Sequence, residues 1–254
     1  MNAIRRLMIA SACAPLLSAQ PELPKDVLQL ARLKREAGAA MAALNNYTCL
    51  ETIQRSQRKN AGQPFQHIDT LQIEVAVVNG QELFSLRGAA FEDRDVSEIV
   101  GSGMMSTGGF TSLIKTVLIN NVSTIRWHGE EEILGRRALR WDYAVPYNLS
   151  RWEINIAGRG GRMSEHGSFW ADSNTLELLR LDTNADDIPP DLQITNIHNV
   201  IDYARTRVRS RDLLLARSVE LLVTHLNGIE HQNRIEFSEC REFSGSSNLT
   251  FDQR

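Results

Sequence analysis

The first long segment of the chain repeats its apolar residues with the period of a helix. Between Pro24 and Leu44 they fall three or four positions apart, and Pro24 with Asp26 is typical of a helix start. At about 1.5 Å per residue this helix would extend roughly 30 Å, enough to cross a sheet. An interfacial membrane helix is the alternative, but a stripe rich in Ala and without Trp or Phe favours packing on the protein's own sheet. The expected buried stripe is Val27, Leu30, Ala31, Ala37, Met41 and Leu44.

From Tyr47 onward the period changes to two, which is typical of strands with one buried face. Ile68 to Val78 alternates apolar and polar side chains, and Asn79 with Gly80 then forms a tight turn. The chain therefore returns as an antiparallel hairpin, whose second strand holds Leu83, Phe84 and Leu86.

This alternation is interrupted between Ala89 and Asn121. Asp93 to Val100 predicts one or two helical turns, followed by a loose stretch of Gly and small polar residues. In that stretch Met104 and Met105 are either contacts for an apolar ligand or ordinary packing. The next apolar residues recur at helical spacing, so we expect a second amphipathic helix on one face of the sheet or over its mouth. They are Phe110, Leu113, Ile114, Val117 and Leu118.

After Asn121 the alternation resumes, with one clear hairpin between Gly167 and Pro190. Phe169 and Trp170 lead into a polar turn, and Leu176 to Leu181 lead out of it. Strict alternation divides the leucines of the second strand between its two faces, so both faces need cover. Leu176 and Leu178 would share one face, and Leu179 and Leu181 the other.

The remaining pattern predicts further strands and sets the fold class. About ten or eleven strands joined mostly by short turns must curl to stay covered. We therefore expect an α+β fold, mainly β: a large curled antiparallel sheet, or half-barrel, with an N-terminal helix and a helical insert on its concave face. Among the expected segments are a strand at Trp152 to Ile156, a turn at Gly158, Gly160 and Gly161, strands at Ile194 to Arg207, Leu213 to Val223 and Ile229 to Phe243, and a short one holding Leu249 and Phe251.

The N-terminus predicts export. Arg5 and Arg6 precede the apolar run Leu7 to Leu17, and a signal peptidase could cut after Ala19. The run is too short for a permanent membrane span. The alternative is lipidation of Cys13, which follows a degraded lipoprotein box. We expect a signal peptide at 1–19, a single domain at 20–254 and a periplasmic location, anchored to the outer membrane if Cys13 is lipidated.

Export leaves Cys49 and Cys240 in a compartment where disulfides persist. A bridge between them would close almost the whole domain, and two separate buried thiols are the alternative. Cys240 shares the parity of Arg234 and Glu236, the outward set, so the bridge would lie on the convex face, at a strand end or beyond a bulge. Their spacing does not suit a metal site.

Charge and motifs exclude several functions. The formal net charge of -3 gives no support to nucleic-acid binding. His128 lacks the HExxH context of a zinc hydrolase, and no GxSxG elbow is present. Glu165 and Asp172 could act as a glycosidase pair only if the fold brings them together. Asp182, Asn184, Asp186 and Asp187 resemble the start of a calcium loop without its glycine or closing Glu. We therefore assign no catalytic residue, metal ligand or cofactor.

An apolar concave surface is the remaining candidate site. The tryptophans lie on successive expected strands and could line it, with the second helix above; an apolar hollow there would suit an acyl chain. Ordinary core packing of these aromatics is the alternative. The candidate ligand-binding residues are Phe110, Leu113, Ile114, Val117, Trp127, Trp141, Trp152 and Trp170.

The order of these parts resembles the lipoprotein-carrier superfamily of LolA, LolB and the sensor RseB. The resemblance is carried by the hairpin FWADSNTLELLRLD; in addition YTCLETIQR, GSFWAD, ADDIPPDL and RIEFSECREFSG look like segments of uncharacterised exported proteins of acidobacterial type. It implies a half-barrel with helices in its mouth that binds acyl groups. No ligand-gating residue of the superfamily matches a position here. The expected function is a non-enzymatic envelope protein holding a lipid or lipoprotein acyl chain. The alternatives are a sensor or interaction module that engages another envelope protein, and a hydrolase with an unrecognised site.

Overall fold

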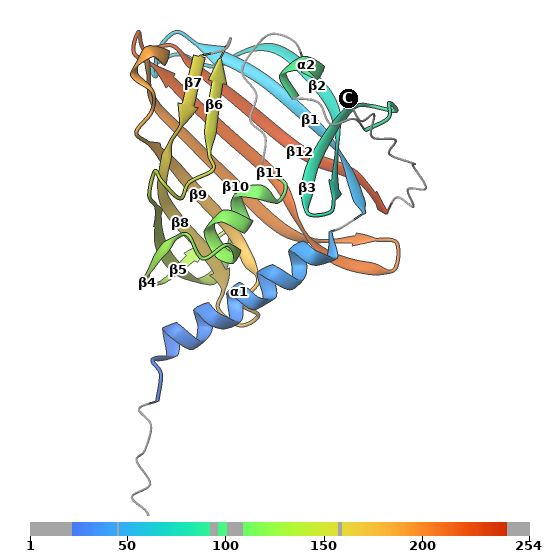
Figure 1. The fold of residues 1–254 in the computed structure, drawn as a ribbon, viewed down its shortest axis with the longest axis vertical. Helices are drawn as coiled ribbons and strands as arrows, with labels where there is room; N and C mark the ends of the chain where they lie inside the picture. Colours follow the sequence, from blue (N-terminus) through green and yellow to red (C-terminus); the bar gives the residue numbers. More distant parts are fainter. Residues whose placement is uncertain (1–21, 45, 92–95, 101–108, 157–158, 243–254) are drawn as a thin grey trace, which may run out of the picture.

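Ten strands form one antiparallel sheet that stays open. The computed structural model describes residues 22–44, 46–91, 96–100, 109–156 and 159–242. In the described chain the sheet runs in the order β3-β2-β1-β12-β11-β10-β9-β8-β5-β4, with β3 and β4 as its edges, which confirms the predicted half-barrel (Figure 1). The strands are β1 (Tyr47–Arg58), β2 (Gln66–Val78), β3 (Gln81–Leu86), β4 (Thr124–Ile133), β5 (Arg136–Val145), β8 (Ser164–Asp172), β9 (Leu178–Asp186), β10 (Ile194–Val208), β11 (Arg211–His225) and β12 (Glu230–Glu242).

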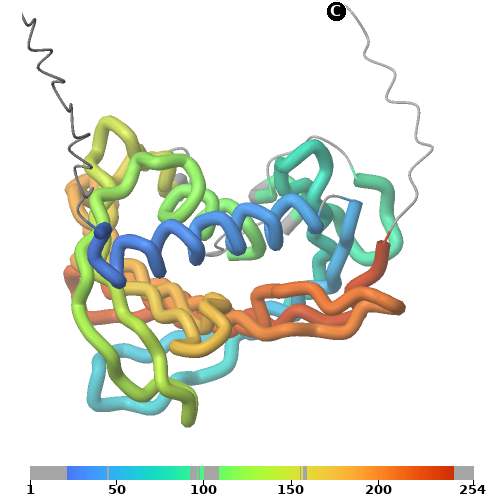
Figure 2. Tube along the Cα trace, turned by 90° about the horizontal axis from the view of Figure 1, so that it is seen from below, coloured from blue at the N-terminus to red at the C-terminus, as the bar shows by residue number. Residues whose placement is uncertain are grey.

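Helical segments cover one face of this sheet. Figure 2 shows α1 (Lys25–Ala43) lying across that face, and α1 contacts the insert. The insert comprises a short α-helix, α3 (Ser112–Ile114), that continues as a π-helical turn, η1 (Lys115–Ile119). Two further short elements are α2 (Val96–Val100) and the 3₁₀ helix η2 (Pro190–Leu192). Both predicted amphipathic helices are confirmed.

The buried stripe of α1 begins later than expected. Leu33, Ala37 and Met41 are buried, whereas Val27 is 44% exposed and Ala31 is exposed. The first turns of α1 face the turn between β8 and β9, at the ends of the strands. They therefore lack a sheet surface on which to bury apolar side chains, and that part of the predicted stripe is wrong.

A second sheet of two strands lies apart from the first. β6 (Glu153–Ile156) pairs only with β7 (Arg159–Arg162), so the predicted strand beginning at Trp152 is not part of the half-barrel. Gly160 and Gly161 lie within β7 instead of forming a turn. Outside the described residues fall Gly158, the predicted signal peptide at 1–19 with Cys13, Met104, Met105 and the short strand at Leu249 and Phe251.

A bulge changes the faces of the β8–β9 hairpin. The pairing register shifts between Trp170 and Ala171, and Leu176 lies in the turn with φ 61°. Leu178 and Leu181 consequently both face the main core, while Leu179 packs with Trp170 on the opposite face. The hairpin is confirmed, but the predicted division of its leucines is wrong because strict alternation ignores the bulge.

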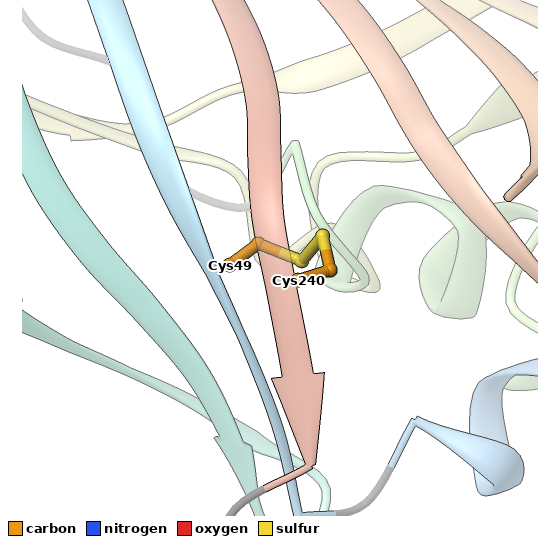
Figure 3. The surroundings of a disulfide bond; sticks show 2 residues. All are labelled: Cys49 and Cys240. Atoms are coloured by element: carbon orange, nitrogen blue, oxygen red, sulfur yellow. A yellow bond between two sulfur atoms is a disulfide. The ribbon is translucent and has the colours of Figure 1, made fainter. Parts of the chain in front are cut away.

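A second bulge positions the disulfide. Cys49 and Cys240 are bonded, and their strands β1 and β12 lie side by side (Figure 3). The register passes from Thr48 opposite Arg241 to Leu50 opposite Ser238, so β12 holds one extra residue, and Glu239 has φ 48°. This extra residue turns Cys240 inward against the main core. The predicted pairing of the two cysteines is confirmed. Of the three positions considered for the bridge, the structure has the one beyond a bulge.

Apolar side chains of the described chain pack in three clusters. The main cluster lies between the concave face of the sheet, α1 and the insert. The second cluster lies where the β6–β7 hairpin covers the other end of the same face, as Figure 1 shows. A small third cluster on the convex face contains Ala138, Trp170 and Leu179.

Candidate functional site

The helical insert presses its apolar side against the concave face. Phe110, Ile114 and Val117 have no exposed surface and Leu113 is buried, all within the main cluster. The ring of Phe110 lies 5.3 Å from that of Phe237 on β12, measured between centroids. The structure thus brings these four predicted residues together, and their contact with a ligand stays a prediction.

Glu82 on β3 holds the start of the insert. Its Oε1 accepts hydrogen bonds from the backbone amides of Thr111 and Ser112, at 2.6 and 2.8 Å, and from both of their hydroxyls. A carboxylate at this place satisfies amides that the first helical turn leaves without partners, and it interacts favourably with the helix dipole. The insert is therefore fixed at its first turn.

The tryptophans do not share one surface. Trp141 is buried, lies 5.1 Å from Trp127 and stacks on Phe169 at 5.5 Å between centroids, so this aromatic group lies on the concave side. Trp170 follows Phe169 directly and therefore points to the convex face, where its indole donates a hydrogen bond to Glu131. Trp152 packs against the second cluster. The expectation of a single tryptophan-lined surface holds only for the pair Trp127 and Trp141.

A row of polar side chains crosses the concave face. Tyr143 lies opposite Gly167, Gly167 opposite Thr183, and Thr183 opposite Asn199, so β5, β8, β9 and β10 contribute one position each. The oxygen atoms of Tyr143 and Thr183 are 2.6 Å apart, which makes a hydrogen bond above Gly167. Thr183 and Asn199 are buried, and Oδ1 of Asn199 has no hydrogen-bond partner among the described residues.

Glu165 adds a buried carboxyl group beside this row. It lies two positions before Gly167 on β8, pairs with Val145 and Ala185, and is 1% exposed. Neither carboxyl oxygen has a hydrogen-bond partner among the described residues. Burial raises the pKa of Glu165 from its ordinary 4.5 to about 7, because a charged carboxylate is poorly solvated there. Burial of the Tyr143 hydroxyl, followed by the charge of Glu165, raises the pKa of Tyr143.

Two further buried polar groups lie near the insert. Oε2 of Glu51 on β1 and the hydroxyl of Tyr203 on β10 also lack hydrogen-bond partners within the described chain. Burial, followed by the charge of Glu82, raises the pKa of both groups. The concave face therefore combines a large apolar cluster with buried polar atoms that the protein itself does not satisfy.

The carboxylate pair considered from the sequence is not formed. Glu165 and Asp172 are seven positions apart on one strand, roughly 23 Å at the rise of a strand, whereas glycosidase carboxylates lie within about 10 Å. Asp172 instead accepts hydrogen bonds from the amides of Asn174 and Thr175 in the turn. Burial by itself would raise the pKa of Asp172, but these two backbone bonds, together with the charge of Arg136 and the hydroxyl of Thr175, lower it overall.

The convex face carries a Ser, a His and an Asp that do not form a catalytic triad. His128 bonds Asp142 at 2.8 Å, but the hydroxyl of Ser168 donates to the same Asp142, at 2.7 Å. A nucleophile would instead hydrogen-bond the imidazole that takes its proton. Within the described ranges no group of three or more His, Cys, Asp or Glu side chains could hold a metal ion, and no helix is long and apolar enough to cross a membrane.

Two hollows open on the surface of the described chain. One, of about 250 Å³, lies between the first turns of α1 and the β8–β9 turn. The other, of about 320 Å³, lies between the end of η1 and the segment at Leu149 and Arg151. Beneath the insert lie the buried side chains of the main cluster. A ligand on the concave face would have to displace part of this cover.

Sequence patterns contained a signal for the polar row. Asn199 stands between Ile197 and Ile201 at an inward position of an alternating strand, and Thr183 stands likewise between Leu181 and Ala185. A polar residue at such an inward-facing position is unusual in a hydrophobic core. The sequence interpretation considered Glu165 only as a glycosidase carboxylate and overlooked the row.

Comparisons with known proteins find similar structures at low sequence identity. No family model and no curated protein sequence matches the chain. A domain assigned to outer membrane lipoprotein sorting from Vibrio parahaemolyticus aligns over 85% of this chain and 93% of its own, with 11% identity and a TM-score of 0.45. A DUF1329 family protein from Desulfovibrio piger aligns over 87% and 95%, with 12% identity and a TM-score of 0.44. The lipoprotein LppX of Mycobacterium tuberculosis aligns over 88% and 100%, with 11% identity and a TM-score of 0.28.

Proposed function

We propose that this chain is an exported, non-enzymatic envelope protein that binds an amphiphile, such as a lipid or lipoprotein acyl chain, on the concave face of the half-barrel. The observation that carries the proposal is a set of buried polar atoms that have no hydrogen-bond partner within the described part of the chain, among them both carboxyl oxygens of Glu165. Folded proteins satisfy more than about 90% of their buried polar groups, so such atoms require an explanation. A bound molecule with both apolar and polar parts would supply it.

The cover of this face suits a site that opens. Helical pieces, and not a second sheet, lie over the main cluster, and part of the insert is a π-helical turn, a conformation common at functional sites. An acyl chain replacing the insert would cover the same apolar surface, at about 0.8 kcal/mol per buried methylene group. The disulfide is in keeping with an oxidising compartment and so supports export.

Binding is tested with protein produced in an oxidising compartment. Native mass spectrometry would detect a co-purified lipid, and titration with a fluorescent C16 acyl probe would measure affinity. Phe110→Ala with Ile114→Ala enlarges the space under the insert and is expected to raise affinity, whereas Leu179→Ala on the convex face leaves it unchanged. The proposal fails if the folded protein and these variants bind neither lipid nor probe.

A protein-binding role is the alternative. The edge strands β3 and β4 have no further strand beside them in the described chain, so a partner could extend the sheet at either edge. Glu130, Glu131 and Glu132 make β4 the less suitable edge. Crosslinked envelope proteins in place of lipid would favour this alternative.

A further inference from the structure

The β6–β7 hairpin is a separate cover over one end of the concave face. Trp152, Ile154 and Ile156 pack against the second cluster, which the sheet supplies through Ile197, Leu221 and Val223. Its strands form no pairs with the half-barrel, and a hydrogen bond from the amide of Met163 to the carbonyl of Trp152 closes its base. An isolated two-stranded hairpin is marginally stable, and displacing this one would break no backbone pairing of the large sheet.

Glu165 stands where the two apolar clusters meet. Its neighbour on β5, Val145, belongs to the main cluster, and its neighbour on β9, Ala185, belongs to the second. Both carboxyl oxygens of Glu165 lack hydrogen-bond partners among the residues that the structure describes. Both oxygens accept hydrogen bonds when Glu165 is ionised.

Among the described residues no Arg, Lys or His contributes to the pKa shift of this carboxyl. Burial is the cause of its raised pKa. The hydroxyl groups of Tyr143 and Thr183 are hydrogen-bonded to each other. A buried carboxylate is stabilised by an opposite charge that also donates hydrogen bonds, and an ammonium group offers three donors.

We infer that Glu165 recognises the polar end of the bound amphiphile, and that this end is a hydrogen-bond-donating cation of the alkylammonium class. The inference rests on the proposed function and specifies its ligand. From Glu165 the apolar part would extend along the concave face, either over the main cluster in place of the insert or over the second cluster in place of Trp152, Ile154 and Ile156. An anionic head would meet the like charge of Glu165 and bind more weakly.

Three probes with one chain length separate the head from the tail. Dodecylamine, dodecanol and dodecanoic acid, each below its aggregation concentration, are titrated by calorimetry at pH 8 against the disulfide-bonded protein. Because the tail is common, differences in affinity report the head alone. We expect dodecylamine to bind about tenfold more tightly than dodecanol, a difference of about 1.4 kcal/mol from its charge-assisted hydrogen bond, and dodecanoic acid to bind least.

Glu165→Gln keeps the shape of the side chain and removes its charge. The variant should bind dodecylamine no better than dodecanol, with the dodecanol affinity unchanged. The matched change Glu130→Gln, on the exposed edge strand β4, should leave the order of the three probes as in the parent. If Glu165→Gln does not fold, the order of the three affinities measured with the parent protein still tests the inference.

The outcomes separate the two proposals. Equal binding of the three heads, stronger binding of the acid, or a preference for the amine that survives Glu165→Gln would overturn this inference and leave amphiphile binding standing. If the folded parent binds none of the three probes, amphiphile binding itself is wrong.

Discussion

The hydroxyl of Tyr143 lies 2.6 Å from Oγ1 of Thr183, so a buried hydrogen bond joins β5 to β9 above the strand between them. The position between them is Gly167, and a Cβ there would stand 1.9 Å from the carbonyl oxygen of Asp182. The bond therefore depends on a residue without a side chain at the centre of the row.

Substitutions at Tyr143 and Gly167, in the polar row on the concave face, should lower the free energy of unfolding by different amounts. Tyr143→Phe removes one buried hydrogen bond and should lower the free energy of unfolding by about 1 kcal/mol. Gly167→Ala forces the backbone of β8 or β9 to move and should cost more, about 3 kcal/mol. Urea unfolding at pH 7 measures both. A Gly167→Ala protein as stable as the parent would show that the close approach to Asp182 is absent in solution.

Glu165 should make stability depend on pH. Between pH 4.5 and about 7 the carboxyl is ionised in the unfolded chain but protonated in the folded protein, so the free energy of unfolding falls as pH rises. A difference of about 2.5 pKa units corresponds to a loss of up to about 3 kcal/mol across this window, and no further loss above pH 7.

The matched variant isolates this contribution. Glu165→Gln does not titrate, so its stability relative to the parent should rise from pH 4.5 to 7 and then stay level. Urea unfolding of both proteins at intervals between pH 4.5 and 8 gives the difference, from which the histidine contributions cancel. Parallel stability curves would show that Glu165 is solvated in the folded protein.

The disulfide should contribute strongly to stability, because its cysteines are 191 positions apart. Cys49→Ala with Cys240→Ala should lower the free energy of unfolding by about 3 kcal/mol, which lies within the range of about 2–4 kcal/mol that is typical of a disulfide. Urea unfolding with and without dithiothreitol checks this. Dithiothreitol should lower the free energy of unfolding of the parent protein and leave that of the double variant unchanged. An equal stability of the parent with and without dithiothreitol would contradict the prediction.

Glu82 should control the order of the insert. Glu82→Ala removes the acceptor for Thr111 and Ser112 and should cost about 2 kcal/mol, the upper end for a helix cap. Hydrogen exchange at 112–119 should become faster, while exchange in α1 stays similar. Glu132→Ala, at an exposed position of β4, serves as the control and should change neither region.

Most elements of the fold were predictable because their signals are local. The helical period before Leu44, the Asn79–Gly80 turn and the alternation in the later strands all depend on residues a few positions apart. The helical insert was predictable for the same reason, and Phe110, Ile114 and Val117 are buried as expected. What these signals left open was which element lies against which.

Two departures from strict alternation share one physical origin. Strict alternation placed Leu178 on the face opposite Leu181, and the bulge beside Trp170 reversed that assignment. The bulge at Glu239 likewise turned Cys240 inward. A single extra residue exchanges the two faces of a strand, and its place is set by pairing with the neighbouring strand.

The sequence by itself determined the helical and strand segments, the open antiparallel sheet and the pairing of Cys49 with Cys240. Only the tertiary structure decided the candidate site, since Tyr143, Glu165, Thr183 and Asn199 come from four strands and meet through interstrand register. The physical reason is that secondary structure follows from neighbouring residues, whereas the burial of Glu165, with no hydrogen-bond partner in the described chain, depends on every element packed around it.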